Sequence, residues 1–181
     1  TLMAHGFPSC YVVRMTRQRI AQLIRDSIAE EGTVETAVKG VQLFRVTQPV
    51  RCAPAVYEPT VVAIVSGSKE AILDGRSYVY DSSRYMCCAM SMPVEAGTPA
   101  ASPEDPLLGV KIALDPRMMT QLAIEMESAA GAIRKPKGGP LPQGFALARW
   151  DDTFTEALWR LVQLGQSPSD SKVLGEGRRR E

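Results

Sequence analysis

The stretch Tyr57–Pro93 reads YEPTVVAIVSGSKEAILDGRSYVYDSSRYMCCAMSMP, in which short apolar runs alternate with turn residues every few positions. The run Thr60–Ser66 is rich in β-branched side chains, which pack well on a pleated sheet. The pair Asp74-Gly75 lies between two further runs, a pattern typical of a tight hairpin turn. No helical period competes within this stretch. It therefore predicts closely spaced antiparallel strands that form a sandwich or a barrel.

Further strands are predicted on both sides of this stretch. Together with those inside it, we expect strands at residues 41–47, 60–66, 69–73, 77–80, 84–92, 106–114 and 145–148. The segment around Pro54 and Pro59 should be extended but irregular, because proline lacks the backbone N–H that a sheet ladder needs. The turn-rich segment 95–105 is predicted to be a surface loop. The barrel is thus expected to comprise residues 33–115 and 145–149.

Amphipathic patterns predict helices at residues 16–31, 116–129 and 151–181. The first has one apolar stripe at helical spacing, formed by Ile20, Leu23, Ile24 and Ile28. Asp115, which precedes a proline, is typical of a helix start, and Asp151 or Asp152 can cap the third helix. We expect these helices to flank the barrel and to form a small subdomain at the C-terminal end.

The size and charge of the chain favour one globular domain. Its 181 residues are 45% hydrophobic, which suffices for a core, and no apolar run reaches the ~18 residues that span a bilayer. A net charge of +1 argues against nucleic acid as the direct partner of this chain. The first 14 residues lack the features of a signal peptide, and we interpret 1–14 as a leader or upstream extension. The expected compartment is the cytoplasm.

The sequence contains few side chains that could bind a metal or act as a catalytic nucleophile with its base. The single histidine is His5, and the four cysteines are Cys10, Cys52, Cys87 and Cys88, without a CxxC pair. A zinc site is therefore not expected, and free thiols in a reducing compartment are the preferred interpretation. Without an internal histidine, no Ser-His-Asp or Cys-His arrangement can form. We predict no metal, no cofactor and no catalytic residue.

Several short motifs follow one another in a characteristic order. They are Glu35-Thr36-Ala37-Val38-x-Gly40, Leu43-Phe44-Arg45, Val56-Tyr57-Glu58-Pro59, Val65-x-Gly67-x-Lys69, Tyr78-x-Tyr80-Asp81 with Tyr85, Ser102-Pro103-Glu104-x-Pro106 and Leu114-Asp115-Pro116. Together they resemble the N-terminal domain of AraC-type (AraC/XylS family) bacterial transcription regulators, over about residues 15–181. No single motif is diagnostic; their order and spacing carry the resemblance.

The resemblance implies an α+β, mainly β fold: a cupin-like antiparallel barrel with flanking helices and a C-terminal helical subdomain. It also implies a domain that senses a small effector or mediates dimerisation. In that family a separate C-terminal helix-turn-helix domain binds DNA, and that domain is not in this sequence. DNA would accordingly be a partner only through the missing domain. Metal-dependent cupins hold their ion with two or three histidines, which this chain lacks.

A metal-free ligand pocket inside the barrel is our site hypothesis. Alternating strand positions place Tyr78 and Tyr80 on one face and Met90 and Met92 on one row. The candidate ligand-binding residues are Tyr57, Tyr78, Tyr80, Arg84, Tyr85, Met90 and Met92. Such a pocket would suit a mostly apolar ligand with an anionic or polar group. The alternative is that these side chains only fill the core, and the face that points inward stays open.

Other functions remain open at this point. A metal-free cupin enzyme of the isomerase kind or a stand-alone binding barrel would fit the same pattern, as would a filled barrel that only dimerises. The third predicted helix has a wide apolar face with Trp159 partly off it, which favours association. We therefore expect a possible homodimer through the C-terminal helices.

Overall fold

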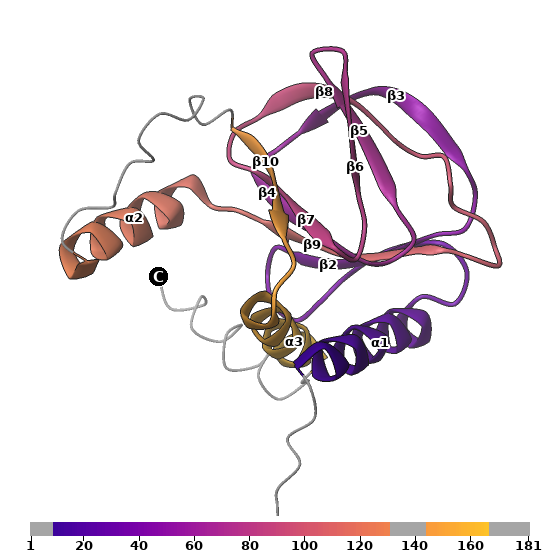
Figure 1. The fold of residues 1–181 in the computed structure, drawn as a ribbon, viewed down its shortest axis with the longest axis horizontal. Helices are drawn as coiled ribbons and strands as arrows, with labels where there is room; N and C mark the ends of the chain where they lie inside the picture. Colours follow the sequence, from indigo (N-terminus) through magenta and orange to yellow (C-terminus); the bar gives the residue numbers. More distant parts are fainter. Residues whose placement is uncertain (1–8, 131–143, 167–181) are drawn as a thin grey trace, which may run out of the picture.

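The computed structural model describes residues 9–130 and 144–166; before Arg14, and in the second helix after Gln121 apart from Ile124 and Glu125, it describes the backbone alone. Two antiparallel sheets face each other and form an open, cupin-like barrel (Figure 1). The six-stranded sheet has the order β1 (Gly32–Glu35), β2 (Val41–Val46), β9 (Leu107–Ala113), β4 (Thr60–Ser66), β7 (Arg84–Cys88) and β10 (Phe145–Arg149). The four-stranded sheet has the order β3 (Val50–Tyr57), β8 (Met92–Thr98), β5 (Lys69–Leu73) and β6 (Arg76–Tyr80). The predicted mainly-β barrel is confirmed.

The alternation along the strands divides the apolar side chains between two cores. In β4, Val62 and Ile64 point between the two sheets, while Ala63 and Val65 point to the outer face of the six-stranded sheet. This follows from the period of two in an extended strand. The larger sheet is therefore buried on both faces, which explains the almost continuous apolar sequence of β4.

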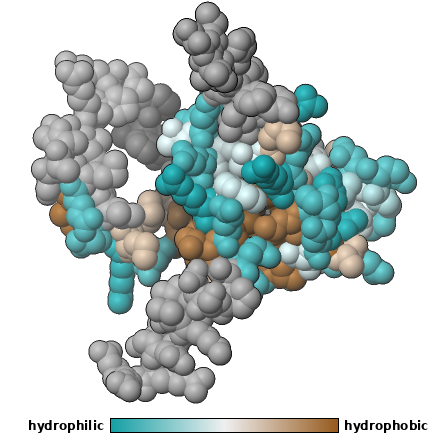
Figure 2. Space-filling view, turned by 90° about the horizontal axis from the view of Figure 1, so that it is seen from below, coloured by the Kyte–Doolittle hydropathy of each residue, from teal (hydrophilic) through white to brown (hydrophobic). Residues whose placement is uncertain are grey.

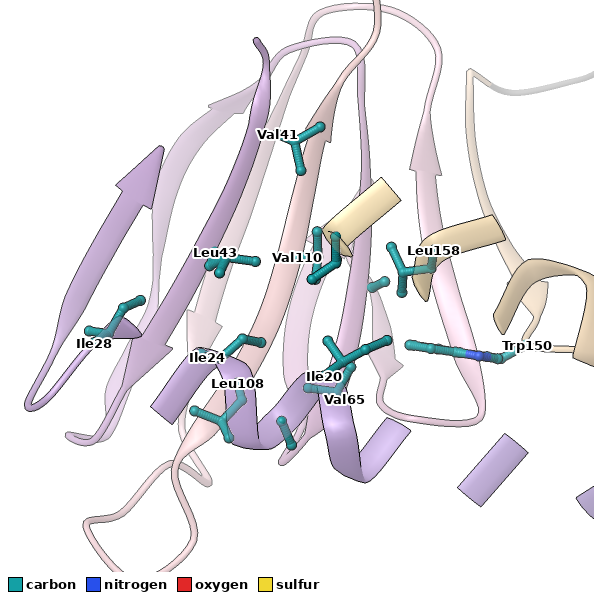
Figure 3. Close-up of a cluster of buried hydrophobic side chains, with 13 residues drawn as sticks. Ile20, Ile24, Ile28, Val41, Leu43, Val65, Leu108, Val110, Trp150 and Leu158 are labelled. Atoms are coloured by element: carbon teal, nitrogen blue, oxygen red, sulfur yellow. The ribbon is translucent and has the colours of Figure 1, made fainter. Parts of the chain in front are cut away.

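The outer core lies under two helices, α1 (Ser9–Ser27) and α3 (Asp152–Gln166), which run side by side across the six-stranded sheet (Figure 1). Figure 3 shows Ile20 and Ile24 of α1 packed against Val65, Leu108 and Val110 of the sheet, with Leu158 of α3 nearby. On the surface of this side, polar side chains surround apolar ones (Figure 2). The predicted isoleucine stripe of the first helix is thus confirmed as its buried face.

The ends of α1 differ from the prediction. The helix begins at Ser9 rather than at residue 16, inside the predicted leader, and ends at Ser27 rather than 31. The sequence from Ser9 to Thr16 has no glycine or proline to interrupt a helix. At the other end the guanidinium of Arg45 donates hydrogen bonds to the carbonyls of Ile28 (3.0 Å) and Ala29 (2.8 Å), which satisfies carbonyl groups after the last turn.

Two predictions around β8 were wrong. The predicted strand 84–92 is two strands, because β7 ends at Cys88 and β8 begins at Met92. The predicted loop 95–105 contains the second half of β8, which pairs with β3 on one side and β5 on the other. The segment predicted as extended and irregular is strand β3, whose register with β8 shifts between Val50 and Ala53. Pro54 is tolerated there because β3 is at the sheet edge.

The second helix, α2 (Pro116–Ala130), leaves the barrel and lies apart from α1 and α3 (Figure 1). Asp115 caps it as predicted: its Oδ1 accepts a hydrogen bond of 2.8 Å from the Arg117 backbone N–H. Met118 and Met119 are exposed. The C-terminal part of the predicted helix 151–181, after Gln166, lies outside the described residues.

The N-terminus of α3 offers a first test of these contacts. Asp151 Oδ1 accepts a 2.8 Å hydrogen bond from the Phe154 backbone N–H, which is otherwise without a helical partner. Asp151→Ala is therefore expected to lower the free energy of unfolding by about 0.5–2 kcal/mol, measured by urea denaturation. Asp152→Ala is the matched control, since Asp152 is exposed and lies within the first turn. Equal losses for both variants would contradict this capping role.

Candidate functional site

The interior of the barrel is apolar except at one end. There the Tyr57 and Tyr80 hydroxyls lie 3.2 Å apart, and Tyr80 is buried. Burial raises the pKa of Tyr80 well above its ordinary value, and the neighbouring Tyr57 raises it further. Burial also raises the pKa of Tyr57. Both phenols stay protonated near neutral pH, so each can donate one hydrogen bond.

Lys69 points into the same space. It shares a face of β5 with Ala71 and Leu73, which belong to the interior cluster, and it pairs in register with Tyr80. Its Nζ lies 5.6 Å from the centroid of the Tyr57 ring, a cation–π distance. Burial lowers the pKa of Lys69, and the positive charge of Lys111 lowers it further. The side chain nonetheless keeps some solvent exposure.

Thr98 completes this polar end. Glu70 of β5 pairs with Gly97 of β8, so Lys69 and Thr98 are at neighbouring positions of the two antiparallel strands. Thr98 and Met92 lie on the same face of β8, and Met92 packs on the interior cluster. The residue is 6% exposed, and its Oγ1 is buried with no hydrogen-bond partner among the described residues. A buried hydroxyl without a partner is costly, which makes this position notable.

Apolar and aromatic side chains line the rest of the interior. They include Val62, Ile64, Met86, Cys88, Leu107 and Phe145. The Tyr78 and Phe145 rings meet edge to face, with centroids 5.0 Å apart. At Gly109 a Cβ would lie 2.3 Å from Cζ of Phe44, so glycine makes room there for the Phe44 ring. Apolar and aromatic surface therefore lies behind the polar end at Lys69.

The structure divides the seven predicted ligand-binding residues into two groups. Tyr57, Tyr78, Tyr80 and Met92 lie in or against the interior cluster. The other three do not reach the interior. Tyr85 lies on the outer face, where its ring stacks on Phe154 with centroids 3.8 Å apart; Arg84 and Met90 are exposed. The prediction of an interior position was wrong for these three. Tyr85 is on the opposite face of β7 from the inward Met86 and Cys88. Arg84 is at the exposed start of the strand, and Met90 follows its end.

Sequence reasoning missed Lys69 and Thr98 as site residues. Lys69 was part of a quoted motif, and its alternation with Ala71 and Leu73 is the signal that could have found it. No such signal existed for Thr98, because its segment had been assigned to a loop. Both positions follow from strand register, which a single sequence does not specify.

In the described ranges no group of three His, Cys, Asp or Glu side chains could hold a metal ion. Cys87 and Cys88 are on opposite faces of β7, as expected, and are free thiols, as is Cys52; His5 and the Cys10 side chain lie outside the described residues. None of the described helices is long and apolar enough to cross a membrane.

A polar groove of about 580 Å³ also lies outside the barrel, beside α1. It is lined by Arg14, Arg17 and Arg25 among others. Arg17 already has partners: its guanidinium donates to the Ser82 carbonyl and lies 5.2 Å from the centre of the Trp150 ring. This arginine therefore joins α1 to the barrel, and we place the candidate site in the interior.

Comparison with solved structures identifies proteins of the same fold. An apo variant of ToxT from Vibrio cholerae strain SCE256 is 11% identical, with a TM-score of 0.50 over 77% of this chain and 52% of that chain. ToxT from the same strain with a bound unsaturated fatty acid is 10% identical, with a TM-score of 0.47 over 83% and 55% of the two chains. A salicylate 1,2-dioxygenase from Pseudaminobacter salicylatoxidans is 12% identical, with a TM-score of 0.45 over 83% and 54%.

The likeness to the apo ToxT variant shows the fold alone, and the chain spans about half the length of the ToxT structures. No curated protein sequence matches the chain. A family model described as the AraC-type transcriptional regulator N-terminus matches residues 37–181, which is most of the chain. The order of motifs, the open cupin-like barrel and this match agree: the chain belongs to the family of AraC-type transcriptional regulator N-termini.

Proposed function

We propose that this domain senses a small effector bound inside its metal-free barrel. The observation that carries the proposal is the polar end formed by Tyr57, Tyr80, Lys69 and Thr98 in an otherwise apolar interior. A barrel that served only as a core would have little reason to retain a lysine and an unpartnered hydroxyl there. A few placed polar groups on apolar walls are typical of a small-molecule site.

A route from this site to the helices runs along β10. Phe145 at its start belongs to the interior cluster, and Trp150 directly after its end belongs to the outer core under α1 and α3. A ligand that displaces Phe145 would therefore shift the anchor of α3. Such a ligand acts by population shift, provided that it binds the two arrangements with different affinity.

The effect on transcription would pass through a helix-turn-helix domain outside this sequence. We propose that the chain forms a homodimer through its C-terminal helices, where α3 exposes Leu164 and half-buries Trp159 and Leu161. Direct DNA contact by this domain does not fit its net charge of +1. A regulator of this kind works in the cytoplasm, and light scattering of the purified chain tests the dimer.

Binding without turnover is what we propose for this barrel. The groups at the polar end of the interior are the Tyr57 and Tyr80 phenols, Lys69 and Thr98, and no carboxylate or imidazole of the described residues lies among them. A carboxylate or imidazole base is thus missing from that set, and Lys69, whose pKa burial lowers, is its candidate base. A metal-free isomerase is the rival, and product formation by the purified domain would favour it.

Three isosteric variants test the location of the ligand. Tyr57→Phe and Tyr80→Phe each remove one hydroxyl of the interior pair, and Tyr85→Phe makes the same change on the outer face. A small-metabolite panel is screened by thermal shift, and hits are titrated by calorimetry. We expect Tyr57→Phe or Tyr80→Phe to weaken binding of a hit about tenfold, and Tyr85→Phe to leave it unchanged. Equal weakening by Tyr85→Phe, or a panel with no hit, would count against the proposal.

A further inference from the structure

We infer that the interior site recognises the carboxylate of an apolar monoanion, with Lys69 as the charge partner and Thr98 as a hydrogen-bond donor. The inference rests on the proposed function and adds the chemical class of the effector. It is carried by two groups that the fold turns inward. In the described part of the chain the Lys69 ammonium has no ion-pair partner, and the Thr98 hydroxyl has no hydrogen-bond partner.

The first group is the Lys69 ammonium. Lysine is seldom retained inside a barrel unless it is paired, because removal of its charge from water is unfavourable. Among residues 9–130 and 144–166 no carboxylate forms an ion pair with it; the ion pair found there, Arg160 with Glu156, is on the surface of α3. The nearest acidic neighbour along the chain, Glu70, points to the other side of β5 and accepts a hydrogen bond from Ser77. In the described ranges the charge therefore has no anion paired with it, and the positive charge of Lys111 acts on it as well.

The second group is the Thr98 hydroxyl. It is next to Lys69 across the β5–β8 pairing, and its oxygen is buried without a hydrogen-bond partner in the described part of the chain. A hydroxyl beside an ammonium is suited to one oxygen of a carboxylate while the ammonium binds the other. Tyr80, in register with Lys69 on the opposite side, supplies a further donor.

The balance of charge and surface selects the class of ligand. Lys69 is the buried positive charge of this site and balances one negative charge; Lys111, whose charge also acts there, is exposed and screened by solvent. A monoanion is therefore compensated more fully than a dianionic phosphate ester. Most of the interior is apolar and aromatic, which disfavours a sugar with many hydroxyls. A carboxylic acid with an aliphatic or aromatic body meets both conditions.

A structural lysine and a ligand-binding lysine differ in one measurable respect. Lys69→Met keeps the length and apolar stem of the side chain and removes the charge. If Lys69 serves to bind an anionic ligand, its charge is unpaired in the ligand-free protein. The ligand-free variant should then melt at a higher temperature than the parent, since an uncompensated charge has been removed. If Lys69 stabilises the fold, the variant should melt lower. Lys39→Met, at an exposed lysine of the β1–β2 turn, is the matched control.

The binding experiment uses the full chain and three carboxylic acids: octanoate, 4-phenylbutyrate and benzoate, each with its primary amide and its alcohol. We expect at least one acid to bind, with its amide and alcohol at least about tenfold weaker. Lys69→Met should abolish this preference, and Thr98→Val should weaken the acid several-fold. Lys39→Met should change neither.

Two results separate this inference from the proposed function. The first is that the neutral amides or alcohols bind as tightly as the acids, and that Tyr80→Phe weakens their binding. This result would overturn the carboxylate inference and leave the sensing function standing. An acid preference that survives in Lys69→Met would also overturn it. Absence of binding by all the acids overturns the inference, and the wider metabolite panel then decides the proposed function.

Discussion

Trp150→Ala is expected to lower the free energy of unfolding by about 3–5 kcal/mol, the range for loss of a buried tryptophan. Trp150 is 5% exposed and joins three parts of the molecule. Its indole Nε1 donates a 2.7 Å hydrogen bond to Thr155 Oγ1, its ring meets Phe154 edge to face at 5.2 Å, and the Arg17 guanidinium of α1 lies 5.2 Å from the ring. Urea denaturation followed by circular dichroism measures the loss, with an unchanged m-value as the sign that two-state unfolding persists.

The second tryptophan is a matched control. Trp159 lies on α3 and is partly buried, so Trp159→Ala removes the same side chain from a less enclosed position. We expect a loss of about 1–2 kcal/mol. Equal losses for the two variants would show that the junction between β10 and α3 is not held by Trp150.

The same junction matters for signalling. Because Trp150 fixes the start of α3 to the end of β10, it is the residue through which a displacement at Phe145 reaches the helices. A milder variant, Trp150→Phe, retains an aromatic ring and removes the hydrogen bond to Thr155 together with part of the packing. It is the variant to use when coupling rather than stability is measured in a full-length regulator.

The strands that the sequence predicts well are those whose amino-acid composition and flanking turn residues both indicate a strand. Thr60–Ser66 is β-branched, apolar and bounded by turn residues, and it is strand β4. The C-terminal half of β8 is the opposite case. Its Gly97 and Thr98, followed by Pro99, resemble a loop in composition, and only pairing with β3 and β5 makes this segment a strand.

The candidate site was harder to predict than the fold, because it depends on which side of each strand faces inward. A shift of one residue in phase moves every side chain to the other face. Tyr80 and Tyr85 are close in sequence and equally plausible as ligand contacts, yet one is interior and the other stacks on α3. A lysine is expected on the surface by default, so the position of Lys69 could be found only from the strand register.

The edge strand β3 passes so close to β8 that a side chain at Gly97 has no room. A Cβ there would lie 2.6 Å from the backbone N of Cys52 and 2.7 Å from the carbonyl oxygen of Val50. This contact occurs where the β3–β8 register shifts, between Val50 and Ala53. The atoms in the way belong to the backbone, so no change of rotamer can relieve the collision and β3 must move.

Gly97→Ala is therefore expected to lower the free energy of unfolding by about 1–3 kcal/mol, as overpacking does, although alanine is the smallest possible addition. Glu95→Ala, at an exposed position of the same strand, should change it by less than about 0.5 kcal/mol. The glycine also directly precedes Thr98, so a displaced β3–β8 pair should disturb the polar end of the barrel. Binding of an interior ligand should thus weaken in Gly97→Ala and persist in Glu95→Ala. A Gly97→Ala variant as stable as the parent would mean that β3 shifts freely, and that this edge of the barrel does not position the site.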